Sequence, residues 1–108
     1  MIDYVALERS LKKAKAAGEA AASEVTDGGS ANHDAVTIRL PRAHLLRVEA
    51  AAKTVGLSVT KLTSRWWRRS FRFDGGFGQG AKNTAAAEAM RESLRADGWE
   101  ASVFSQAD

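Results

Sequence analysis

Five residues that alternate between apolar and polar side chains constrain the fold more than any other part of this sequence. Val36, Ile38 and Leu40 point to one side of a short strand, and Thr37 and Arg39 point to the other. A single strand cannot satisfy its own backbone donors and acceptors. This strand therefore needs a partner, either from a strand near the C terminus or from a second copy of the chain.

Two helical patterns follow the strand, which Pro41 ends. In the first, apolar residues recur at intervals of three and four until a glycine suited to a helix C terminus: Leu45, Val48, Ala52 and Val55 before Gly56. Ser58 is a typical N-cap and predicts a second helix that continues to Phe71. The expected order is strand, helix, helix.

Segments on both sides complete the expected organisation. Residues 1–34 predict a thin amphipathic helix and then a linker, TDGGSANHD. Residues 35–73 form the expected folded unit. Residues 74–108 begin with a glycine-rich linker and continue with a helix and a short strand, whose apolar positions are Ala86, Met90, Leu94, Trp99, Ala101 and Val103.

Basic charge is concentrated in the centre of the chain. The net charge is +3, but residues 35–72 contain nine Lys and Arg and one Glu, a local balance of +8. Such a segment favours a polyanionic partner. The chain has no cysteine and two distant histidines, which argues against disulfides, metal sites and cofactors. No apolar run approaches the roughly 20 residues that span a bilayer, so we expect a cytoplasmic protein without membrane contact.

A symmetric dimer offers the strand an economical partner. Two copies of residues 36–40 pair antiparallel in this arrangement, and the helices of both chains pack beneath them in a shared core. Thr37 and Arg39 then face outward from a two-stranded ribbon, which is an element that fits the major groove of DNA.

Residues 35–71 resemble the ribbon-helix-helix family of DNA-binding proteins, the class of the Arc and methionine repressors. The resemblance rests on VTIRLP, on the apolar spacing of the first helix and on the turn Gly56-Leu57-Ser58. It covers about a third of the chain. The fold class it implies is mainly α with one short strand: an intermolecular ribbon over a four-helix core, with a helical N-terminal extension and a helix-strand C-terminal extension.

The resemblance also implies site residues. It places three residues toward the base edges, where Arg can bind guanine and Thr can bind a base or touch a thymine methyl: Ala35, Thr37 and Arg39. Phosphate contacts are expected from the amides that open the second helix and from nearby cations: Ser58, Val59, Thr60, Arg42, Lys53 and Lys61. The expected dimer core consists of Val36, Ile38, Leu40, Leu45, Val48, Leu62, Trp66 and Trp67.

Trp66 and Trp67 depart from the family pattern. Their size favours burial in the dimer core, since each ring can bury roughly 150 to 250 Å². The alternative is base stacking by an aromatic and basic cluster, as in proteins that bind single strands, because arginines follow both rings. His44 stands where the family usually has an apolar residue, and we interpret it as a partly buried neutral histidine.

The expected function is sequence-specific binding of double-stranded DNA as a homodimer, in the role of a transcriptional repressor. An antitoxin, a plasmid partition factor or a relaxosome accessory protein would combine the same module with a protein-binding C-terminal segment. A protein-binding adaptor that never touches DNA is the alternative from a different class. DGGFGQGAKNT lacks the Gly-Lys-Ser/Thr order of a phosphate loop, and no catalytic set stands out, so we do not expect an enzyme.

Overall fold

The structure is a computed structural model that describes residues 2–26, 34–63, 65–78 and 80–104. Most of the predicted linker, including His33, lies outside these ranges. None of the helices in the described ranges combines the length and the apolar character that crossing a bilayer requires.

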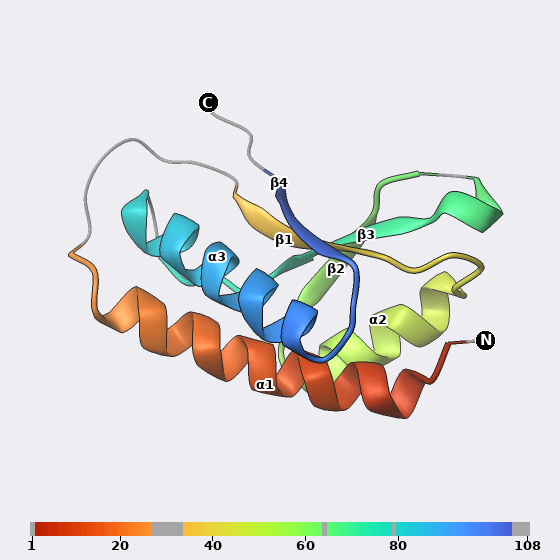
Figure 1. The fold of residues 1–108 in the computed structure, drawn as a ribbon, viewed down its shortest axis with the longest axis horizontal. Coiled ribbons are helices and arrows are strands. Elements are labelled where there is room, and N and C mark those ends of the chain that lie inside the picture. Colours follow the sequence, from red (N-terminus) through yellow and green to blue (C-terminus); the bar gives the residue numbers. More distant parts are fainter. Residues whose placement is uncertain (1, 27–33, 64, 79, 105–108) are drawn as a thin grey trace.

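A four-stranded antiparallel sheet carries helices on one face (Figure 1). The elements in chain order are α1 (Tyr4–Ser23), β1 (Ala35–Arg39), α2 (Leu45–Thr54), β2 (Ser58–Lys61), the 3-10 turn η1 (Trp66–Arg68), β3 (Ser70–Asp74), α3 (Ala81–Ala96) and β4 (Ala101–Phe104). The strand order is β2-β3-β1-β4. From β1 onward this is the β-α-β-β-α-β arrangement of ferredoxin-like folds, with α1 added at the N terminus.

The helices follow the apolar spacing of the sequence. On α1, small and aliphatic side chains at intervals of three and four are buried: Leu7, Leu11, Ala14, Gly18 and Ala22. The Asp3 carboxylate accepts a hydrogen bond from the Ala6 amide and caps this helix at its N terminus. The predicted stripe of α3 is confirmed, since Ala86, Met90 and Leu94 are all buried. Gly56 follows α2 with a φ of 79°, which suits glycine.

The alternation in β1 is confirmed, but its partners come from the same chain. Val36 lies opposite Phe73 and Ile38 opposite Phe71 in β3. On its other side β1 pairs with β4, where Ile38 lies opposite Ala101. β1 is therefore a central strand, and its backbone groups are satisfied without a second molecule.

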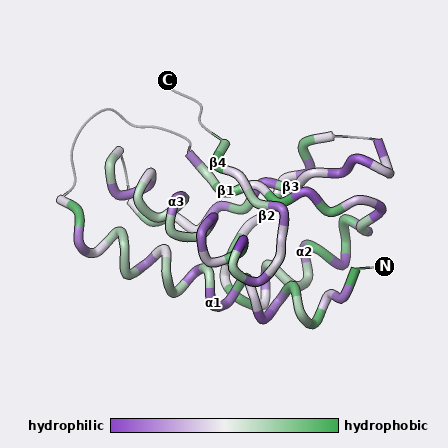
Figure 2. Tube along the Cα trace, viewed as in Figure 1, coloured by the Kyte–Doolittle hydropathy of each residue, from purple (hydrophilic) through white to green (hydrophobic). Residues whose placement is uncertain are grey.

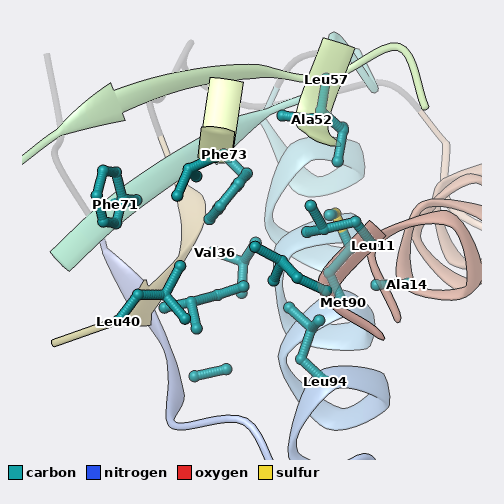
Figure 3. Close-up of a cluster of buried hydrophobic side chains, with 14 of the residues drawn as sticks. Leu11, Ala14, Val36, Leu40, Ala52, Leu57, Phe71, Phe73, Met90 and Leu94 are labelled. Carbon is teal, nitrogen blue, oxygen red and sulfur yellow. The ribbon is translucent and has the colours of Figure 1, made fainter. Parts of the chain in front are cut away.

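One hydrophobic core joins the sheet to all three helices (Figure 3). Phe71 and Phe73 of β3 are its largest side chains and pack with Val36 of β1. The two segments expected outside the DNA-binding domain supply buried residues to the same core, namely Leu11 from α1 and Met90 from α3. Both helices therefore contribute to the stability of the sheet.

The predicted ribbon-helix-helix fold is wrong. The stretch expected to form the second helix, residues 58–71, forms β2, η1 and the start of β3 instead. The described residues form an α/β fold with four strands, and the predicted ribbon shared between two copies of β1 does not form because β3 and β4 occupy both edges of that strand.

The predicted dimer core divides into two groups. Five of its residues do lie inward, within the core of one chain: Val36, Ile38, Leu40 and Val48 are buried, and Leu45 is partly buried. The other three are exposed, at 41% for Leu62, 37% for Trp66 and 56% for Trp67. They fail as core residues because they lie in or beside the connection between β2 and β3 and not on a helix beneath the sheet.

Asp97 at the end of α3 ties this helix to α1. Its carboxylate accepts hydrogen bonds from the Ser10 hydroxyl and the Lys13 ammonium, each at 2.8 Å. The Lys13 hydrogen bond and then the Ser10 hydrogen bond lower the pKa of Asp97 below its ordinary value. A carboxyl with a lowered folded-state pKa stabilises the fold above its unfolded pKa, which is about 3.9 for aspartate.

We expect Asp97→Asn to be less stable than the parent at neutral pH, with a difference that shrinks as the pH falls through the lowered pKa of Asp97. The measurement is the urea midpoint of both proteins over a pH series. Glu88→Gln removes the same charge from an exposed position of α3 and serves as the control. A parent-to-variant difference that stays constant down to the acid end of the series would contradict the assignment.

Candidate nucleic-acid interface

The connection between β2 and β3 carries a cluster of cations and rings that we call the hairpin tip: Arg65, Trp66, Trp67, Arg68 and Arg69. It lies beyond one end of the sheet, where η1 turns the chain back into β3 (Figure 1). Apart from Arg69, these residues are exposed. Hydrophilic residues dominate the far end of this hairpin (Figure 2).

Contacts with the turn before α2 hold the hairpin tip in place. The Arg69 Nη1 donates to the Ala43 carbonyl at 2.7 Å, and the Arg42 amide donates to the Trp66 carbonyl at 2.7 Å. Arg42 adopts a φ of 62°, which is uncommon for a residue with a side chain. These two bonds anchor the tip to a part of the chain that follows β1 directly, so the tip is positioned before any partner arrives.

The two tryptophans of the tip differ in what covers them. The Arg69 guanidinium lies 4.6 Å from the centre of the Trp66 ring, and His44 meets the same ring edge-on at 5.0 Å. Trp67 is the more exposed ring. Trp66 therefore helps to build the tip, and Trp67 has a ring surface available for a partner. His44 is exposed, so its expected partial burial is wrong.

Negative charge is absent from the sequence around the tip. No Asp or Glu occurs between Glu49 and Asp74, while Arg65, Arg68 and Arg69 fall within the tip itself. Arg42 adds an exposed cation in the adjoining turn. Cations clustered at one end of a small domain attract polyanions and hold phosphate oxygens by charge-assisted hydrogen bonds.

The three residues predicted to contact bases lie on the open face of the sheet, in its centre. Thr37 is half-buried, and its hydroxyl is 3.4 Å from the Ser102 carbonyl. Arg39 lies 3.6 Å from the Glu100 carboxylate, and Ala35 is buried. The face they share carries both signs of charge and the Phe104 ring opposite Ala35, and β1 is no free ribbon because it is paired on both sides.

The predicted phosphate contacts are scattered. Ser58, Val59 and Thr60 lie in β2, so the expected helix N terminus with free amides does not exist there. Lys61 ends β2 and leads toward the hairpin tip, whereas Lys53 lies on α2. The structure therefore brings only Arg42 of the predicted contacts directly against the tip.

Sequence reasoning assigned Trp66 and Trp67 to a core because their size favours burial. The run RWWRRSFRFD indicates a strand instead, since Phe71 and Phe73 alternate with Arg72 and Asp74. A strand that starts at Ser70 leaves both tryptophans in the preceding connection. Comparisons of the chain with protein-family models, curated proteins and solved structures found no match.

Proposed function

We propose that this chain binds single-stranded nucleic acid through the hairpin tip, with Trp67 stacked on an unpaired base and the neighbouring arginines on phosphates. The observation that supports this function is a tryptophan kept 56% exposed within a cationic loop. Proteins that bind single strands combine these two features, because every base has a face for stacking and every nucleotide has a phosphate.

A single strand fits this site better than a duplex. Bases in a duplex are stacked on one another and present only their edges, so a ring such as Trp67 has no base face to contact. The expected repressor function depended on a ribbon made from two copies of β1, and β1 already pairs with β3 and β4. Binding to duplex DNA is therefore expected to be weaker and confined to phosphate contacts.

The test is a binding titration with a labelled oligonucleotide, used once as a single strand and once annealed to its complement. We expect tighter binding to the single strand, and a logarithm of affinity that falls with the logarithm of salt by about 0.7 for each phosphate contact. An absence of binding to both forms at low salt would eliminate this function and favour a protein-binding adaptor.

Trp67→Ala is expected to weaken single-strand binding by about 1 to 3 kcal/mol, because one base loses its stacking partner. The salt dependence should change little, since no cation is removed. The measurement is the same titration at several salt concentrations.

Two variants control this prediction. Trp67→Phe keeps a ring and should recover part of the affinity, while Val5→Ala alters an exposed apolar residue of α1 that is not part of the tip. Equal affinities for Trp67→Ala and the parent would exclude stacking by this ring.

A further inference from the structure

The edge of β2 has backbone groups that point away from the sheet. The Leu62 amide donates to the Ser70 carbonyl at 2.8 Å, which makes these two residues a hydrogen-bonded pair of the antiparallel ladder. Such pairs alternate along a strand, so Ser58 and Thr60 also face β3, and Val59 and Lys61 direct their N–H and C=O groups outward. Within the described residues no strand lies beyond β2 on this side of the sheet, so these four groups are available to another strand.

Apolar side chains flank this edge on both faces of the sheet. On the helix side, Leu46 of α2 is 78% exposed, the highest value among the large apolar residues of the described chain. It lines a shallow groove between α2 and β2 together with Glu49, Ala50, Lys53, Leu57, Ser58 and Val59. On the open face, Leu62 is 41% exposed. Exposed leucines beside a free strand edge are features of a surface that pairs with another strand.

The opposite edge of the sheet, formed by β4, is flanked by charged side chains and not by exposed leucines. Beside β4, the helix is α3, which carries Arg91, Glu92 and Arg95. Arg91 pairs with Glu92, and the Arg95 Nε donates to the Ala101 carbonyl at 2.8 Å. Charged side chains that bond to their own helix or strand protect an edge, whereas the β2 edge has exposed leucines.

We propose that two copies of the chain associate through their β2 edges and form a continuous eight-stranded antiparallel sheet. A two-fold axis perpendicular to the sheet makes the two identical strands antiparallel. With Thr60 opposite its own copy, Val59 of each chain pairs with Lys61 of the other, and all four outward groups of each strand form hydrogen bonds. This register also separates the two Lys61 side chains, which would repel each other if directly opposite.

Charge on α2 supports a second copy as the partner. The same two-fold axis brings the α2 helices together in antiparallel orientation, and each Leu46 then lies toward one end of the helix pair. Glu49 and Lys53 are one turn apart on the groove side of α2. In the proposed dimer the two helices cross level with Ala51, so that Glu49 lies opposite the partner's Lys53 twice in each dimer.

This association goes beyond nucleic-acid binding and does not depend on it. In the dimer each chain contributes one hairpin tip, so a single strand that spans both tips gains affinity from two linked contacts. The dimer is tested without nucleic acid, and its failure therefore leaves the proposed function of the tip intact.

The test is sedimentation equilibrium of the full chain over a range of concentrations. We expect a reversible dimer of twice the 11.6 kDa chain mass. Leu46→Glu, Glu49→Lys and Lys53→Glu are each expected to raise the dimer dissociation constant at least about tenfold. The double variant Glu49→Lys/Lys53→Glu restores opposite charges across the axis and should recover dimerisation.

Lys12→Glu makes the same charge change on α1 and should leave the dimer unchanged. Circular dichroism of every variant confirms that the fold is kept, which is expected because all four positions are exposed. A chain that stays monomeric at every concentration would overturn the proposal. A dimer insensitive to the Leu46, Glu49 and Lys53 variants would also overturn it, since another surface would then hold the copies together.

Discussion

Removal of residues 76–108 is expected to leave a chain that does not fold. The deletion takes away α3 and β4, and with them buried core side chains: Ala86, Ala87, Met90, Leu94 and Ala101. Truncation of a single buried side chain such as Met90 or Leu94 to Ala typically lowers the free energy of unfolding by about 2 to 5 kcal/mol. The free energy of unfolding of a whole domain is only about 5 to 15 kcal/mol. The deletion also exposes one edge of β1, which pairs with β4 in the complete chain.

Far-UV circular dichroism during a urea titration measures this effect. The truncated chain should show little helical signal and no cooperative transition, whereas the complete chain should unfold cooperatively. A shorter deletion, of residues 105–108, removes no part of α3 or β4 and is the control. A cooperative transition in the longer deletion would mean that residues 1–75 form an independent domain, as the separate modules expected from sequence would require.

The need of β1 for a partner strand was predictable from sequence, but the identity of the partner was not. The alternation of Val36, Ile38 and Leu40 establishes that one face is buried and that the backbone needs neighbours. Both partners are in the same chain, as β3 and β4. The C-terminal strand was anticipated in the sequence, and its pairing with β1 was one of the two alternatives that the pattern left open.

Residues 58–73 show why the prediction of a second helix failed. Leu62, Trp66 and Ser70 recur every four residues as on a helix, while Phe71 and Phe73 alternate as on a strand. A local pattern cannot decide between the two. The pairing of Phe71 with Ile38 decides it in favour of a strand, because this contact lies between residues more than thirty positions apart and buries both side chains completely.

The exposure of the hairpin tip also results from residues 70–74 forming a strand and not the end of a helix. Large aromatic residues are buried more often than exposed, so size alone assigns Trp66 and Trp67 to a core. Their exposure depends on where β3 begins, and that boundary is set by pairing across the sheet. The basic charge of residues 35–72, in contrast, can be read directly from the composition. It still indicates a polyanionic partner in the folded molecule, because Arg65 and Arg68 are exposed beside the rings.

Truncation of a buried side chain of α1 is expected to destabilise the whole fold. Leu11→Ala should reduce the free energy of unfolding by about 2 to 5 kcal/mol, because this side chain is completely buried in the shared core and its loss leaves a cavity. Val5→Ala on the same helix is the matched control, since Val5 is 69% exposed and its truncation should change stability by less than about 0.5 kcal/mol. Urea denaturation of both variants measures the two free energies. If α1 were an extension outside the folded unit, the two variants would be equally stable, so equal urea midpoints would contradict the packing of α1 against α2 and α3.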